Sequence, residues 1–393
     1  MSEPRYIAAA ERRARLGVRQ LLAPSARAGR PEEVAEALVA LHGTDPASVY
    51  LSVGARLKDA AETVAETGRA LYGERTLVRM HGMRHTVFVF PAALTAVVHA
   101  STGLAVAARE RAALLKDMAK AGAPDAVWLK EVEESALAAL ARRGEATASE
   151  LAEDEPRLRE QFVYAAGKSY EGVHTVSTRL LKVLGVEGKV VRGRPLGSWT
   201  SSQFRWAPAP EHPELDVAEA QASLLRRWLA VAGPATEADL KWWTGWRVTE
   251  VRRALAAIGA EEVRLDEGPG YVLEGDAGPV ECEEPWAALL PALDPAPMAR
   301  QHRDWFLAPG LRAALFDRSG NVGPTVWWNG RVVGGWAQRA DGEIVWRMLD
   351  GEGAGRDAEA AVAAEAERLR AWVGGTRITP RFRTPLEREL ATG

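Results

Sequence analysis

Two short stretches of this chain, GEATASEL and GPATEADL, follow one plan and share four of their eight residues. Each comes after a helix-length segment and places a threonine, Thr147 or Thr236, where it can cap a short helix. A further helix and two short strands follow, around Gly188 in the first copy and within 261–275 in the second. Because three helices and a strand pair make a winged helix, this recurrence constrains the chain to repeated units of that kind.

The first hundred residues show the same order with extra elements. Pro31 and the glutamates after it are typical of a helix N-terminus, and this helix ends at Gly43. Two short apolar strands, 77–80 and 86–90, then flank Gly82. The pattern predicts a further winged-helix unit here.

From about residue 305 the chain changes in character. The segments VWWNGRVVGGW and RADGEIVW alternate in polarity about Asn-Gly and Asp-Gly, which are strong hairpin signals. A chain of 393 residues is also too long for a single core. We therefore predict an α+β fold, with three tandem winged-helix domains and then a small antiparallel β-barrel, over 1–110, 120–205, 215–290 and 300–393.

Composition narrows the function classes only in part. The net charge of −3 neither demands nor excludes a nucleic-acid partner, because a balanced total can hide a basic groove. Cys282 is the only cysteine, which excludes an internal disulfide and a cysteine metal cluster. The sequence has no secretory leader pattern, no run of 18 apolar residues, no HExxH motif and no Walker loop. We expect a cytoplasmic, nucleoid-associated protein without a metal, a cofactor or a membrane contact.

The hexapeptide LHGTDP, residues 41–46, separates two expected helices of the first unit. Asp45 suits the N-cap of the second helix, and Pro46 suits its first turn. His42 and Thr44 allow two interpretations. They are turn or cap residues, or they are the polar side chains of an active site placed on a helix boundary.

Polar side chains near the expected hairpins and helices are candidates for DNA contact, because winged-helix strands approach phosphates and the minor groove. The alternative for each is a solvated surface charge. The segment WTSSQFRWAP is either a DNA-facing hairpin or a connector packed by its tryptophans, and we favour the connector. The candidates in these regions are Arg79, Arg84, His85, Arg179, Lys182, Gln203, Arg205 and Lys241.

Several phrases resemble the AlkZ/YcaQ-like winged-helix DNA glycosylases, and they occur in this order: LHGTDPASVYLSVGARL, VRMHGMRHTVFVFP, GPATEADLKWWTGW, LLPALDP and GPTVWWNGRVVGGW. The resemblance covers nearly the whole chain. It implies a C-shaped array of three winged helices around duplex DNA, and hydrolysis of N7- or N3-alkylated purine nucleotides at the N-glycosidic bond. Bulky genotoxin adducts and crosslinks are among the substrates that it implies. It also places ARQHRDW, with Arg300 and Arg303, near the DNA-facing surface.

The resemblance implies catalytic positions within LHGTDP. Family members carry Gln-x-Gln or Gln-x-Asp there, so His42 and Thr44 replace both of the family's residues. A cationic alkylated purine is already a good leaving group, so the site needs only to expose C1′, stabilise an oxocarbenium-like sugar and position a water. A neutral His42 can accept a proton from that water, and Thr44 can hold it. Asp45 can offset the charge of the sugar if backbone N–H groups do not take its carboxylate.

Three function classes follow. The leading prediction is a monofunctional DNA glycosylase, a monomer whose partner is double-stranded DNA with alkylated purines. The replaced glutamines favour, as the alternative, a non-catalytic DNA-binding protein that acts as a regulator or a lesion binder. A scaffold for a protein partner is the third class, and it predicts no salt-dependent DNA affinity.

Overall fold

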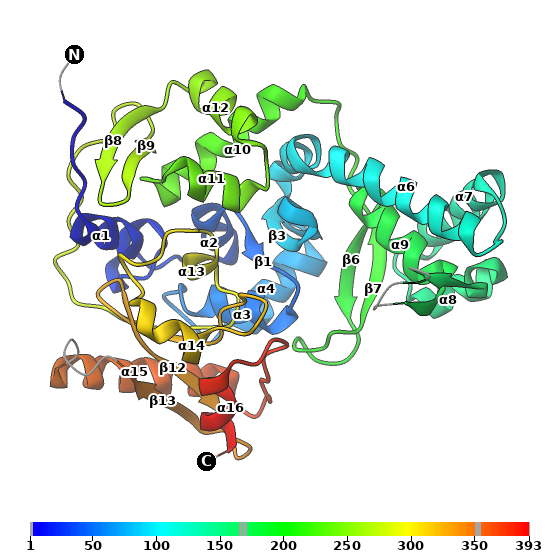
Figure 1. Cartoon of the computed structure of the whole chain (residues 1–393). Coiled ribbons are helices and arrows are strands. Elements are labelled where there is room, and N and C mark those ends of the chain that lie inside the picture. The colour runs from blue at the N-terminus through cyan, green and yellow to red at the C-terminus, as the bar shows by residue number, and fades with distance from the viewer. Residues whose placement is uncertain (1–2, 165–166, 168–170, 350–354, 393) are drawn as a thin grey trace.

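The computed structural model describes residues 3–164, 167, 171–349 and 355–392. These residues form three successive helix-and-hairpin units and then an antiparallel four-stranded sheet, which is the predicted order. Figure 1 shows the second unit, with α6 to α9, extending to one side of the other parts. The domain boundaries stay a prediction.

The first unit contains a strand that the sequence did not predict. Its helices are α2 (Pro31–Leu38), α3 (Pro46–Gly54) and α4 (Thr63–Gly68), and its strands are β1 (Leu41–His42), β2 (Leu77–His81) and β3 (Val87–Pro91). Val39, with a φ of 63°, ends α2. The next residues are extended, and Leu41 and His42 pair with β3, so the sheet order is β1-β3-β2. The segment between the two helices is therefore partly a strand.

The second unit confirms one prediction and corrects two. Its elements are α6 (Leu104–Lys120), α7 (Ala126–Arg143), α8 (Ala148–Asp154), β4 (Gln161–Tyr164), β5 (Gly172–Thr175), α9 (Val176–Val186), β6 (Val190–Pro195) and β7 (Phe204–Pro208). Thr147 caps α8 in a capping box with Glu150, as expected. The strand pair predicted around Gly188 is wrong, because this glycine, at a φ of 70°, follows the end of α9. β6 pairs instead with β7, so WTSSQFRWAP forms a hairpin tip and strand and not a connector.

The third unit follows the predicted order closely. It contains α10 (Val217–Ala232), α11 (Glu237–Thr244), α12 (Val248–Ala257), β8 (Glu261–Leu265) and β9 (Gly268–Val272). Thr236 caps α11 in a capping box with Asp239. The strands β8 and β9 form the expected hairpin.

The C-terminal part is an antiparallel sheet with helices on it. Its elements are β10 (Ala287–Leu290), β11 (Thr325–Trp328), β12 (Arg331–Gln338), β13 (Ile344–Met348), α15 (Arg356–Val373) and α16 (Pro385–Thr392), with the short helices α13 (Pro295–Met298) and α14 (Arg312–Leu315) between β10 and β11. Among the described residues the strands pair in the order β10-β11-β12-β13, and closure into a barrel stays a prediction. Leu369 of α15 and Leu51 of α3 share a core with Trp336 of β12. The helix after the LHGTDP segment therefore packs on this sheet.

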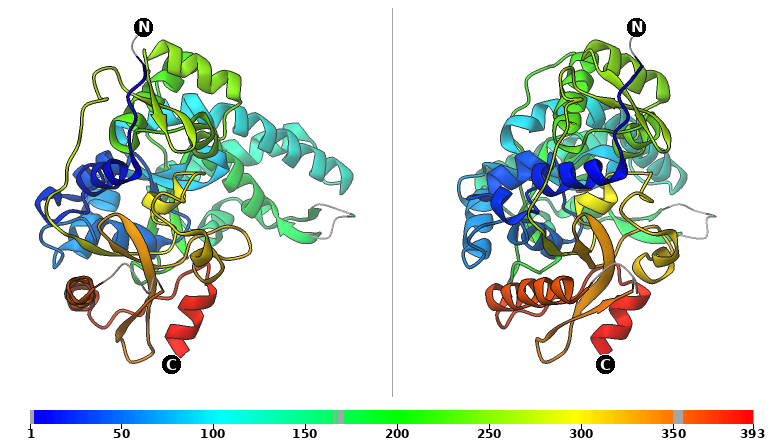
Figure 2. Two further views of the ribbon diagram at one scale, coloured as in Figure 1. Left: turned by 60° about the vertical axis from the view of Figure 1, so that its left-hand side comes forward. Right: turned by 90° about the vertical axis from the view of Figure 1, so that its left-hand side faces the viewer.

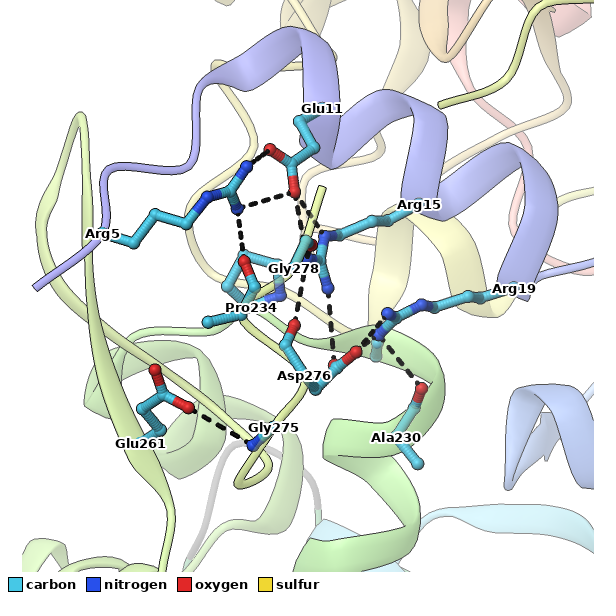
Figure 3. A network of polar contacts seen from close by, with 12 residues as sticks. Arg5, Glu11, Arg15, Arg19, Ala230, Pro234, Glu261, Gly275, Asp276 and Gly278 are labelled. Carbon is cyan, nitrogen blue, oxygen red and sulfur yellow. Dashed lines mark hydrogen bonds and ion pairs between the residues drawn. The ribbon is translucent and has the colours of Figure 1, made fainter. Parts of the chain in front are cut away.

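The helix α1 (Ala9–Arg19) joins the first, third and C-terminal parts, and Figure 2 shows it between them. Glu11 accepts hydrogen bonds from Arg5 and Arg15. Asp276, after β9, forms ion pairs with Arg15 at 3.4 Å and with Arg19 at 2.5 Å (Figure 3). The N-terminal segment thereby fastens the third unit to the rest of the molecule.

One helical run, Ala92–Lys120, includes α5 (Thr95–Val98) and α6. It is long and apolar enough to cross a membrane by length and composition alone. It also packs against α9 and α10, and 44% of its most apolar window is buried inside the protein.

Candidate active site and nucleic-acid interface

The backbone of LHGTDP is held against β3. His42 lies opposite Phe88 in the strand pairing, and the Gly43 amide donates to the Val87 carbonyl at 2.8 Å. A Cβ atom added at Gly43 would lie 3.2 Å from the carbonyl carbon of Phe88. A larger residue would therefore force the backbone of Phe88 to shift, and glycine allows this close approach of two backbones. This contact with β3 sets the positions of the Cα atoms of His42 and Thr44, on either side of Gly43.

His42 is a buried, neutral imidazole. Its exposed fraction is 9%, its ring centroid lies 5.2 Å from that of Phe88, and its Nδ1 has no hydrogen-bond partner among the described residues. Burial, followed by the charge of Arg84, lowers the pKa of His42 to about 4. Trp243 and Met298 also line the small pocket beside it. His42 can therefore exchange hydrogen bonds with a water near neutral pH, but it is a weak proton acceptor.

The side chains of Thr44 and Asp45 differ in whether their oxygen atoms are already hydrogen-bonded within the protein. Thr44 is half-buried, and its hydroxyl has no hydrogen-bond partner in the part of the chain that the structure describes. Asp45 accepts from the Ala47 amide at 3.2 Å through Oδ1 and from the Arg381 amide at 3.0 Å through Oδ2. The predicted N-cap is confirmed. Backbone N–H groups therefore bind both carboxylate oxygens of Asp45, so this carboxylate is not free to offset the charge of a sugar. Burial raises the pKa of Asp45.

Three of the candidates for DNA contact are buried, so they are not on the solvent-exposed surface where the sequence analysis placed them. Arg79, 3% exposed, donates from Nε to the Gly43 carbonyl at 2.8 Å. Arg300, 4% exposed, donates to the Pro234 carbonyl at 3.1 Å and to the Ala232 carbonyl, and burial lowers its pKa to about 10. Arg179 is also buried. The sequence shows that these residues are charged, but it does not show that other segments of the protein bury them.

The other candidates lie nearer to solvent, and their DNA contacts stay predictions. Lys241, Gln203 and Arg84 are exposed, whereas Lys182 and Arg205 are half-buried and form ion pairs with Glu110 and Glu150. His85 also lies near Glu110, at 3.5 Å.

Trp242 brings two of the candidates together. The Arg84 guanidinium lies 4.9 Å from its ring centroid, and that of Arg303 lies 5.5 Å from it. Arg303 also donates from Nε to the Pro297 carbonyl, and burial lowers its pKa to about 10. An aromatic ring in contact with two guanidiniums therefore lies beside the His42 pocket, which Arg84 also lines.

Sequence reasoning missed Arg381. Its Nη1 lies 3.5 Å from the Thr44 carbonyl, and its backbone amide binds Asp45. The only signal was a basic C-terminal segment, and its contact with residues 336 and 337 positions earlier depends on the tertiary fold. Within the described residues, no group of three or more metal-ligating side chains is found.

Comparison with known proteins identifies the family. The family model described as "DNA glycosylase AlkZ-like" matches residues 35–372. The fold is similar to that of the Streptomyces sahachiroi DNA glycosylase AlkZ, with a TM-score of 0.70 and 22% sequence identity over 93% of this chain and 97% of that one. No curated protein sequence matches the chain. The match spans most of the chain, includes the LHGTDP segment and agrees with the fold, so the chain belongs to the AlkZ-like DNA glycosylase family.

Proposed function

We propose that this protein is a monofunctional DNA glycosylase that hydrolyses the N-glycosidic bond of N7- or N3-alkylated purines in duplex DNA. Family membership supports the class of reaction. The observation that carries the proposal is the pair of polar groups at the ends of the His42-Gly43-Thr44 segment. One is a neutral imidazole and the other a hydroxyl without a protein partner among the described residues, and both stand where the resemblance places catalytic side chains.

The chemistry suits a weak base. The bond between C1′ and the purine nitrogen breaks with its electron pair going to the base, so a cationic N7-alkylguanine leaves as a neutral molecule. The oxygen of a water then bonds to C1′ of the oxocarbenium-like sugar and loses a proton to solvent. The Thr44 hydroxyl accepts a hydrogen bond from this water or donates one to it, and His42 orients the water. The depressed pKa of His42 keeps its ring neutral, so it adds no positive charge beside a cationic sugar.

The alternative function is DNA binding without catalysis. Two observations favour it: the motif lacks both glutamines, and the Asp45 carboxylate is taken by backbone amides. We propose that DNA repair and genotoxin self-resistance are the biological setting of the catalytic function, and that the protein acts as a monomer in the cytoplasm on the nucleoid.

The test uses duplexes that each carry one modified purine: N7-methylguanine, N3-methyladenine, a bulky N7 adduct or a crosslink. After incubation, alkali cleaves any abasic sites, and chromatography detects the free base. Abasic sites together with free base support the glycosylase. A salt-dependent gel shift without either product supports the binding protein. No affinity for DNA at any salt concentration contradicts both and favours a scaffold.

A further inference from the structure

Three arginines from distant parts of the chain cluster together, and two of them contact the backbone of the LHGTDP segment. Arg79, on β2, donates to the Gly43 carbonyl, and Arg381, before α16, lies 3.5 Å from the Thr44 carbonyl. Arg192, on β6, shares the ring of Phe204 with Arg79. The guanidinium carbons of Arg192 and Arg79 lie 4.6 Å and 5.8 Å from the centroid of that ring. The first unit, the second unit and the C-terminal part each contribute one guanidinium.

These guanidiniums lack the carboxylate partners that other arginines of this protein have. In the described part of the chain no carboxylate lies within ion-pair distance of Arg79, Arg192 or Arg381, whereas Arg205, on the neighbouring strand, pairs with Glu150 at 2.6 Å. Asp45 interacts with two of them at longer range, but its oxygens are bound by backbone amides. The cluster therefore holds more positive than negative charge.

Two donors of the cluster are buried without a partner. Nη1 of Arg79 and Nε of Arg192 have no hydrogen-bond acceptor in good geometry among the described residues, although the Arg79 guanidinium also interacts with the Tyr72 hydroxyl. Burial, followed by repulsion from Arg79 and Arg381, lowers the pKa of Arg192 to about 9. Buried polar groups are nearly always satisfied, so these donors, beside cations that repel one another and have no carboxylate partner, are suited to an anionic ligand.

One side of the arginine cluster is accessible to solvent, and the other side is buried and packed against neighbouring elements. Arg381 is exposed and Arg192 is half-buried, so both are within reach of a ligand, and Arg79 forms the buried floor. Trp199, at the tip of the β6–β7 hairpin, packs on Tyr50 of α3 and Trp372 of α15, with ring centroids 5.2 Å and 6.0 Å apart. Figure 1 shows this hairpin reaching the segment before α16. The tip of the hairpin is thus anchored to α3 and α15, and its strand β6 carries Arg192 beside Arg79 and Arg381.

We propose that Arg79, Arg192 and Arg381 form a pocket for one DNA phosphate, the phosphodiester that flanks the nucleotide whose base is excised. Guanidiniums bind phosphate oxygens in a bidentate manner, and several of them can share one phosphate. His42 and Thr44 are two residues apart, so their Cα atoms lie at most about 7 Å from each other. A phosphate on Arg381 therefore places the adjoining sugar beside both side chains. The inference rests on the proposed function in taking duplex DNA as the ligand.

The test combines charge removal on the protein with charge removal on the DNA. The variants are Arg192→Gln and Arg381→Gln, with Arg370→Gln as the matched control, because Arg370 is an exposed arginine on α15 that pairs with Glu367. Because one phosphate is involved, the slope of log K against log salt concentration should fall by about 0.9 in the Arg192→Gln, Arg381→Gln double variant and stay unchanged in the control. A neutral methylphosphonate at the flanking position should weaken binding by the wild type by about tenfold and should have no further effect on the double variant.

Arg192→Lys separates lost charge from a disturbed hairpin, because it keeps the positive charge at this position. It should restore the wild-type salt slope and only part of the affinity, since lysine cannot bind in a bidentate manner. If the methylphosphonate weakens binding equally in the wild type and the double variant, the proposal of a phosphate pocket is wrong, even if base excision is observed. If the variants behave as expected but no base is released from any duplex, the proposed glycosylase function fails and the pocket stands.

Discussion

Arg56 and Asp294 form an ion pair in which neither side chain is exposed to solvent. Arg56 donates to both carboxylate oxygens at 2.8 Å, and Asp294 also accepts from the Ser52 hydroxyl at 2.7 Å. Arg56 follows α3, the helix that begins at Asp45, whereas Asp294 precedes α13 in the segment LLPALDP. The pair therefore anchors the helix of the candidate motif to the C-terminal part of the molecule.

Removing one partner of this pair should destabilise the protein strongly. Asp294→Ala leaves the Arg56 guanidinium buried without a counter-charge, and we expect a loss of about 3–5 kcal/mol in the free energy of unfolding. Arg56→Met combined with Asp294→Leu should lose less than the sum of the two single variants, because no charge then remains buried. Denaturant unfolding measures these differences. Arg370→Gln, which removes an exposed arginine, should change stability by less than about 0.5 kcal/mol. Additive losses in the double variant would contradict this interpretation.

The same pair shows what sequence can and cannot predict. Local signals were sufficient for the order of the three units and for the caps at Thr147, Thr236 and Asp45, because capping depends on residues a few positions apart. The phrases that contain Arg56 and Asp294 were recognisable, but their contact joins residues 238 positions apart.

The features of the candidate site that the sequence does not reveal have the same origin. Arg79 and Arg300 carry the residue type expected at a DNA surface, yet other parts of the chain cover them. Arg381 meets the motif only through the tertiary fold. Gly188 marks a helix end and not a hairpin, a difference that backbone angles decide and composition does not.

The Gly43→Ala substitution should impair base excision, although it adds only one methyl group. The added methyl group meets the backbone of Phe88 at 3.2–3.3 Å and pushes the His42–Thr44 segment away from β3. We expect a loss of about 1–3 kcal/mol in stability and a slower single-turnover release of base. Gly68→Ala is the matched control, because an added Cβ there has no neighbour within 4 Å and the φ is −64°. It should leave excision unchanged, and equal rates in the two variants would argue against the close approach at Gly43.

His42 should make the protein less stable in mild acid. Its pKa is about 4 in the folded state and about 6.5 when unfolded, so the unfolded state binds more protons between these values. The free energy of unfolding therefore falls as the pH drops below about 6.5, and the contribution of His42 is about 1–2 kcal/mol between pH 7 and pH 5. His42→Gln should lose less stability than the wild type over this interval, as denaturant midpoints at the two pH values will show. Identical losses would mean that His42 titrates normally in the folded protein.

The rate of excision should not vary with a histidine ionisation near neutral pH. Because burial and Arg84 keep His42 neutral, we expect a flat single-turnover profile between pH 6 and pH 8. His42→Gln restores the residue found in the family's motif and should retain base release, since an amide can also orient a water. A profile that falls by tenfold per pH unit below pH 6.5 would assign His42 the role of a general base with an ordinary pKa.

The central claim is that His42 and Thr44 replace the family's glutamines in catalysis. The most direct measurement is single-turnover release of N7-methylguanine from an alkylated duplex by the wild type, His42→Ala and Thr44→Val, with DNA affinity measured in parallel. The account predicts release by the wild type, a rate at least about tenfold lower in each variant, and affinities within about threefold of one another. Release at the wild-type rate by both variants would contradict it.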